Sequence, residues 1–124
     1  MAIPGSSDGQ EVLRRGVITT QSNAWTSFKF DGTSPTTGTS SYTVPSNHII
    51  TLLSIVWCET GNAAEIFHLS LEPIYIIVNQ ALAARETFIY SERLNMEGGE
   101  KLQTYITSSA DVDVFYSYLD QDWS

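Results

Sequence analysis

The stretch "SYTVPSNHIITLLSIVWCETGNAAE", residues 41–65, decides how the chain folds, because it holds the main apolar run of the sequence. The run covers residues 48–58, which is shorter than the ~18 residues that a membrane-spanning helix needs. It is rich in isoleucine and valine, which favour a strand. Apolar residues on both faces predict a central strand covered on both sides, and Pro45 suits its start. One side would face a second sheet, and we expect Trp57 on the other side, against a loop or a neighbouring subunit.

A period of two runs through the rest of the chain, and turn residues such as "ETGN" and "EGGE" interrupt it at short intervals. In "DVDVFYSYL", residues 111–119, apolar and polar side chains alternate as they do in a half-buried strand. Evenly spaced short strands predict an all-β protein, a β-sandwich or jelly roll of eight or nine short antiparallel strands. Residues 80–85 are expected to form at most one helical turn. The predicted strands are 12–19, 24–30, 41–44, 48–58, 63–71, 74–78, 86–91, 101–107 and 112–119.

The length of 124 residues predicts one domain. We expect residues 1–10 to form an N-terminal arm and residues 11–124 to form the sandwich, with an exposed loop at 31–40 and a short C-terminal tail, "DQDWS". The single cysteine, Cys58, excludes an internal disulfide and is expected to be a small buried side chain. The chain starts without a basic segment followed by an apolar core, so no secretory signal is predicted, and folding in a cytoplasm-like compartment is expected.

The charge of the chain is −8 and is unevenly distributed. Residues 1–58 hold three acids and three bases, whereas residues 59–124 hold eleven acids and three bases. A surface that binds nucleic acid or an anionic membrane needs a basic patch, so neither is an expected partner. An acidic face serves solubility, and it can also meet a basic face on a protein partner.

The sequence shows no motif that would place catalytic groups together. Neither His48 nor His68 stands in a metal-binding spacing, no glycine-rich phosphate loop is present, and Cys58 has no base near it in sequence. The pairs Asp111–Asp113 and Asp120–Asp122 do not fit a calcium loop, so a solvated acidic strand edge is the preferred interpretation. We therefore expect no enzyme activity, no cofactor and no metal.

The tryptophans offer the clearest candidates for a contact surface. Trp123 stands next to the last residue, where chains usually fray, so it is expected either to dock on its own domain or to anchor a neighbouring subunit. The residues chosen as a candidate interface are Trp25, Trp57, Asp122 and Trp123.

Two longer segments, "SYTVPSNHIITLLSIVWCETGNAAEIFHLSL" at 41–71 and "LNMEGGEKLQTYITSSADVDVFYSYL" at 94–119, resemble a module of virion proteins in tailed bacteriophages, including phages of cyanobacteria and marine bacteria. The resemblance covers residues 41–119. It implies a β-sandwich that serves as a building or interaction piece of the particle, and it brings no catalytic residues with it.

The resulting hypothesis is a non-enzymatic virion protein, assembled in the host cytoplasm, and within that class a capsid decoration (cement) protein. Its partners would be copies of itself, with a trimer favoured, and the major capsid protein. Four alternatives stay open. They are a tail adaptor or fibre component, a carbohydrate-binding module built on Trp25, Asn23 and Asp31, an enzyme, and an unrelated soluble binding domain.

Overall fold

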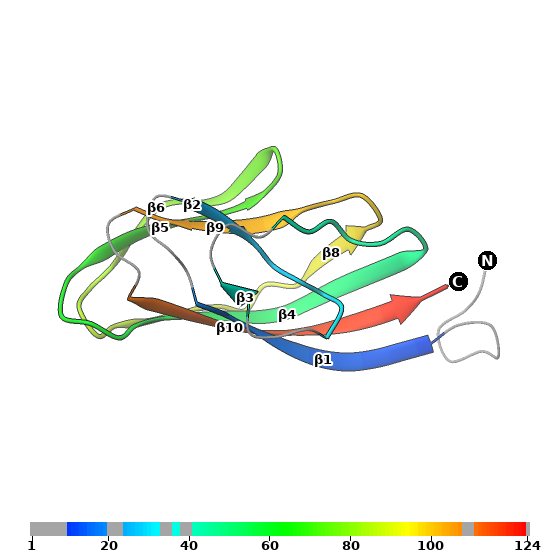
Figure 1. Ribbon diagram of the computed structural model, residues 1–124, viewed down its shortest axis with the longest axis horizontal. Coiled ribbons are helices and arrows are strands. Elements are labelled where there is room, and N and C mark those ends of the chain that lie inside the picture. The colour runs from blue at the N-terminus through cyan, green and yellow to red at the C-terminus, as the bar shows by residue number, and fades with distance from the viewer. Residues whose placement is uncertain (1–9, 20–23, 33–35, 38–40, 108–110, 124) are drawn as a thin grey trace.

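The structure, a computed structural model, describes residues 10–19, 24–32, 36–37, 41–107 and 111–123. Within these residues the chain forms ten β-strands and no helix, and two sheets pack face to face (Figure 1). The predicted all-β sandwich is confirmed. No helix among the described residues is long and apolar enough to cross a membrane. The strands are β1 Gln10–Thr19, β2 Ala24–Ser27, β3 Thr36–Thr37, β4 His48–Glu59, β5 Glu65–Leu71, β6 Ile74–Leu82, β7 Thr87–Tyr90, β8 Leu94–Glu97, β9 Leu102–Ile106 and β10 Val112–Asp122.

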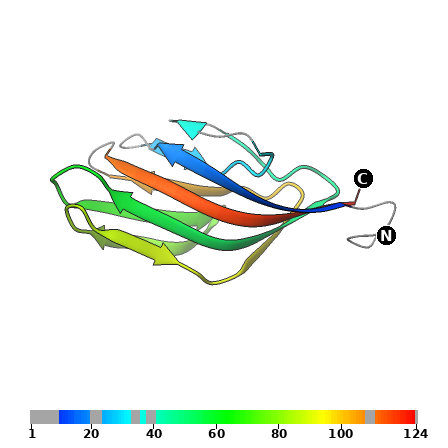
Figure 2. The same cartoon turned by 90° about the horizontal axis from the view of Figure 1, so that it is seen from below.

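The strand order is that of a jelly roll. One sheet has the order β3-β1-β10-β4-β7, with β8 also paired to β4, and the other has the order β2-β9-β5-β6. Figure 2 shows β1, β10 and β4 side by side in the larger sheet. If the two-residue β3 is set aside and β7 and β8 are counted as one interrupted strand, the chain changes sheet after every strand except β5, which forms a hairpin with β6.

The central position predicted for residues 48–58 is confirmed, because β4 pairs with β10 on one side and with β7 and β8 on the other. Trp57, however, faces the core and is fully buried, so the prediction that it lies on the second side is wrong. The cause is a register shift against β10, where Ser117 pairs with Ser54 and Tyr118 with Leu52. Leu53 is the extra residue of this bulge, and it exchanges the faces of every residue after it.

Trp57 is held in the core by contacts with two strands of the opposite sheet. Its ring stacks on Phe67 of β5 with a centroid distance of 4.5 Å, and its Nε1–H donates to Thr104 Oγ1 of β9 at 3.1 Å. The same exchange of faces turns Cys58 outward, where it is half-buried. The expectation that Cys58 is a buried core residue is therefore wrong.

Tyrosines of β10 form a second part of the core together with Phe28 and Phe30. The Tyr116 hydroxyl donates to the Lys29 carbonyl at 2.6 Å and accepts from the Lys29 N–H at 3.1 Å. The Tyr118 hydroxyl accepts from the Gly32 N–H at 3.1 Å. These contacts fasten the segment after β2 across the sandwich, and the Tyr116 ring covers Gly16 of β1 so closely that a Cβ there would overlap it.

Several predicted boundaries need correction. Residues 41–44 form no strand, and the expected helical turn at 80–85 is wrong because β6 continues to Leu82. The expected tail is largely strand, because β10 continues to Asp122 alongside both β1 and β4. The arm predicted at 1–10 lies outside the described residues except for Gln10, which begins β1. Strands β3 and β8 were not predicted.

Replacing Gly16 by alanine is expected to lower the free energy of unfolding by about 1–3 kcal/mol, because the added methyl group overpacks against the Tyr116 ring. Urea unfolding of Gly16→Ala, of Tyr116→Leu and of the double variant Gly16→Ala/Tyr116→Leu measures the coupling energy between the two positions. The loss in the double variant should be smaller than the sum of the losses in Gly16→Ala and Tyr116→Leu, since the smaller side chain makes room for the added methyl group. Wild-type stability in Gly16→Ala would contradict the close contact.

The core tyrosines predict a loss of stability at high pH. Burial, together with the negative charge of Asp31, raises the pKa of Tyr42 from 10.0 to about 12, and burial raises the pKa of Tyr116 and Tyr118 as well. The unfolded chain therefore loses these protons first, so the stabilisation is complete below pH 10 and is lost as the pH rises through about 12. Thermal unfolding across this range, with tyrosinate absorbance, measures the effect. Tyr42→Phe should make the loss between pH 10 and about 12 smaller, because the phenylalanine has no proton to release.

Candidate functional site

The outer face of the larger sheet carries an apolar row that runs across four strands. Phe115 is 40% exposed and Ile89 is 62% exposed, and the other two members are half-buried. The outer face of an antiparallel sheet in a monomeric sandwich is normally polar, so this exposed apolar row is a candidate contact surface. The strand register places its members side by side in the order Val17 of β1, Phe115 of β10, Val56 of β4 and Ile89 of β7.

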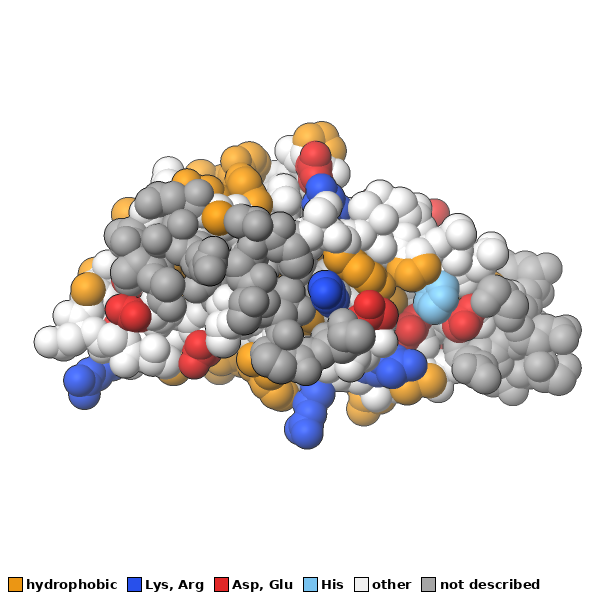
Figure 3. Space-filling model, viewed as in Figure 1, with side chains coloured by type: hydrophobic (Ala, Val, Ile, Leu, Met, Phe, Trp, Pro, Cys, Tyr) orange, Lys and Arg blue, Asp and Glu red, His pale blue; other side chains and the backbone are white. Residues whose placement is uncertain are grey.

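Further apolar residues stand beyond a polar rung of the same face. Arg15 of β1 pairs with Ser117 of β10 and forms the polar rung. Two residues further along the same face, Leu13 pairs with Leu119. Leu13 is 69% exposed. Apolar side chains are visible along both the upper and the lower margin of the molecule, over the outer sides of both sheets (Figure 3).

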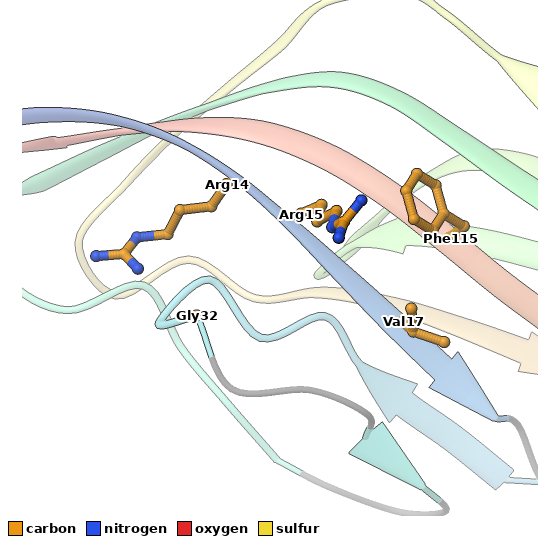
Figure 4. A pocket seen from close by; sticks show the side chains of 5 residues that line it. All are labelled: Arg14, Arg15, Val17, Gly32 and Phe115. Atoms are coloured by element: carbon orange, nitrogen blue, oxygen red, sulfur yellow. The ribbon is translucent and has the colours of Figure 1, made fainter.

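Two open hollows flank Arg15 at the β1 edge of this face. The first, of about 680 Å³, is lined by Arg14, Arg15, Val17, Gly32 and Phe115. Figure 4 shows both arginines on β1, with Phe115 on the neighbouring strand. The second, of about 430 Å³, adds Leu13, Leu53 and Ser117 to the same two arginines. A positive charge beside apolar surface suits a partner that offers an apolar side chain next to a carboxylate.

The end of β10 holds a cluster of charges. His48 lies between two carboxylates, with Nδ1 2.8 Å from Asp120 Oδ1 and Nε2 3.5 Å from Asp122 Oδ1. Arg14 Nε is 3.7 Å from Asp120 Oδ2. Asp122, which the sequence suggested as an interface residue, thus pairs with a histidine of its own domain and helps to join β10 to β4.

Trp123 is tied to its own domain through its backbone. Its N–H donates to the Asn47 carbonyl at 2.7 Å, directly before β4. The side chain is half-buried, and its indole N–H is buried with no hydrogen-bond acceptor among the described residues. Docking on its own domain therefore has a defined contact, whereas a contact with a neighbouring subunit stays a prediction.

Trp25 belongs to an aromatic cluster on the outer face of the smaller sheet. Its ring centroid is 5.2 Å from that of Tyr105, 5.9 Å from Tyr75 and 6.3 Å from His68. These residues come from four different strands, so no short motif in the sequence could have revealed the cluster. Asn23, which the sequence suggested beside Trp25, lies outside the described residues. Asp31 precedes Gly32, whose N–H donates to the Tyr118 hydroxyl, and Asp31 is not a member of the aromatic cluster around Trp25.

Three carboxylates meet at the end of the sandwich where β4 stops and β5 and β10 begin. One oxygen of each of Glu59, Glu65 and Asp111 lies within 4.8 Å of the others, and the two glutamates are each 1% exposed. Hard cations such as Ca²⁺ take carboxylate oxygens, so these are the described residues that could hold a metal. The sequence pattern had paired Asp111 with Asp113, but Asp113 is exposed opposite Cys58 on the outer face.

Glu59 already has a structural task in this trio. Its Oε2 accepts from the Gly61 N–H at 3.0 Å and its Oε1 accepts from the Arg85 N–H at 3.1 Å. Arg85 has a positive φ of 62°, so the carboxylate fixes a turn that ordinary residues adopt rarely. One buried side chain thus ties the turn after β4 to the turn between β6 and β7.

We expect Glu59→Ala to lower the free energy of unfolding by about 1–3 kcal/mol, because two backbone donors lose their acceptor. Glu59→Gln keeps one acceptor oxygen and should lose less. Chemical denaturation of both variants measures the difference. Equal losses in the two variants would show that these hydrogen bonds contribute little.

Comparison of the chain with known protein families, with curated proteins and with solved structures gives no match.

Proposed function

We propose that the protein is a non-enzymatic structural protein of a tailed-phage virion, and within that class a capsid decoration (cement) protein that binds the head shell. The observation that carries the proposal is the apolar row Val17, Phe115, Val56 and Ile89. It is an uninterrupted apolar band on a sheet face, and Ile89 at its end is more than half exposed. Covering such a band with a partner removes apolar surface from water, which drives association.

The resemblance of residues 41–119 to phage virion modules supplies the class of partner. The resembling segments include β4, β5, β8, β9 and β10, which contribute strands to both sheets of the sandwich. The apolar row takes two of its four members, Val56 and Phe115, from these segments. The proposed contact surface is therefore built in part from the stretch that carries the resemblance.

The proposed partners are the major capsid protein and further copies of the chain. A shell surface with apolar side chains and a carboxylate would complement the apolar row and the neighbouring Arg15. A homo-oligomer, with a trimer favoured, would present several copies of the row at once, and the linked contacts would strengthen binding. A tail adaptor or fibre component is the alternative, and it would use the same surface against a tail protein.

The test is co-sedimentation with undecorated heads, and separately with isolated tails, from the tailed phage whose genome carries the coding sequence. Saturable binding to heads is expected. Ile89→Glu and Phe115→Glu should each weaken it about tenfold or more, because each places a charge in an apolar contact.

Ile74→Glu is the matched control. Ile74 is 65% exposed, much like Ile89, but it lies on β6 of the other sheet, so this variant should bind heads as the wild type does. Binding to tails alone would assign the protein to the adaptor or fibre class. Absence of binding to both, or equal loss in Ile74→Glu and Ile89→Glu, would contradict the proposal.

A further inference from the structure

The aromatic cluster lies on the opposite outer face from the apolar row, and we propose that it is a binding site for a neutral carbohydrate. Its members are Trp25 of β2, Tyr105 of β9, His68 of β5 and Tyr75 of β6, so it crosses all four strands of the smaller sheet. This inference goes beyond the assembly role, because it gives the second face of the sandwich a ligand of its own.

The cluster follows from the strand register. Trp25 pairs with Tyr105, and Tyr105 pairs with His68, so three rings stand in one rung across β2, β9 and β5. Tyr75 joins them from the edge strand, with its centroid 5.9 Å from Trp25 and 6.1 Å from His68. Tyr75 is 52% exposed, and the other three rings are half-buried.

The rings lean on one another and do not lie in one plane. The Trp25 ring makes angles of 56° with Tyr105 and 68° with Tyr75. Contacts of this kind hold each ring in place without another element covering it. A sugar ring carries C–H groups on one face and hydroxyls at its rim, so it can pack that face against an aromatic ring that is already fixed.

Polar groups stand beside the rings. The neighbouring rung on the same face runs from Ser27 through Gln103 and Ser70 to Tyr75. Its two serines are each 2% exposed, so the half-buried Gln103 is the polar side chain of this rung that a ligand can reach. His68 Nδ1 accepts the Asn79 N–H at 3.1 Å, so the neutral ring carries its own proton on Nε2 and offers it as a donor. The Gln103 amide and the tyrosine hydroxyls add both donors and acceptors, which is what sugar hydroxyls need.

The charge of this face selects the class of ligand. None of the described residues in these two rungs is Asp, Glu, Lys or Arg, although the chain as a whole carries −8. Lys101 and Glu72 are paired with each other at 3.5 Å. Single-stranded nucleic acid also stacks on aromatic rings, but it requires a positively charged groove that the two rungs lack. An uncharged face with fixed rings and interleaved amide and hydroxyl groups therefore favours a neutral sugar.

The experiment is affinity electrophoresis of the full chain in gels that contain a soluble β-glucan, α-glucan, galactan or mannan, followed by calorimetric titration of the polysaccharide that retards it. Alginate and a single-stranded oligonucleotide serve as charged probes. Retardation by at least one neutral polysaccharide is expected, and Trp25→Ala and Tyr75→Ala should each weaken it about tenfold. Circular dichroism checks the fold, and the exposed Tyr75 supplies a variant that does not depend on Trp25.

Phe115→Ala is the matched control, because it removes a partly exposed aromatic ring from the other outer face and should leave polysaccharide binding unchanged. The carbohydrate inference is overturned by absence of retardation in all four neutral gels, by retardation that Trp25→Ala and Tyr75→Ala leave unchanged, or by binding to the charged probes only. Loss of head or tail binding in Trp25→Ala, without any polysaccharide binding, would instead assign the cluster to a protein contact and also overturn it. Polysaccharide binding without head or tail binding would leave this inference standing while contradicting the assembly role.

Discussion

A single extra residue in β4, Leu53, determines which side chains of the central strand face inward. Ile50 and Leu52 are buried before it and Ile55 and Trp57 after it, so the bulge changes the parity of the strand halfway along its length. Without this change Trp57 would point to solvent and Val56 would point into the core. The tightly packed contact of Trp57 with Phe67 and Thr104 and the continuous apolar row on the outer face therefore have the same origin.

The sequence was informative where side chains follow a simple period. Strands β4, β5, β9 and β10 were predicted from alternation, and a jelly roll was among the predicted folds. Trp57 was misplaced because "HIITLLSIVWC" is apolar at almost every position, so the sequence does not mark where the parity changes. Strand β8 was missed because "LNME" offers too few alternating residues to register as a strand.

The candidate surfaces were harder to predict, because each is assembled across strands that are distant in the chain. Trp25 was chosen from its residue type, but its ring partners come from β5, β6 and β9, and only the strand order places them together. The trio of Glu59, Glu65 and Asp111 was missed for the same reason, since its members belong to three separate turns or strand ends. In both sites the residues are neighbours only because of the strand order of the jelly roll.

The two outer faces are independent of each other in chemistry as well as in position. One offers aliphatic side chains and a phenylalanine beside two arginines, and the other offers tyrosine, tryptophan and histidine beside uncharged polar groups. The core between them is filled by large side chains such as Trp57, Tyr116 and Tyr118. Substitutions on one face can therefore be made without disturbing the other, so the two proposed functions can be tested separately.

The pairing of the first and last long strands also affects how the fold can be joined to other proteins. Gln10 pairs with Asp122, so the start of β1 and the end of β10 lie side by side at the same end of the sandwich (Figure 1). The two points at which such a domain would be joined to another chain are neighbouring strand residues, as they are in a β-hairpin. It can be spliced into a surface loop of an unrelated protein, or rejoined end to end and reopened at another loop, without crossing its own sheets. Evolution could thus reuse the same sandwich as an insertion in a larger polypeptide with both outer faces still accessible.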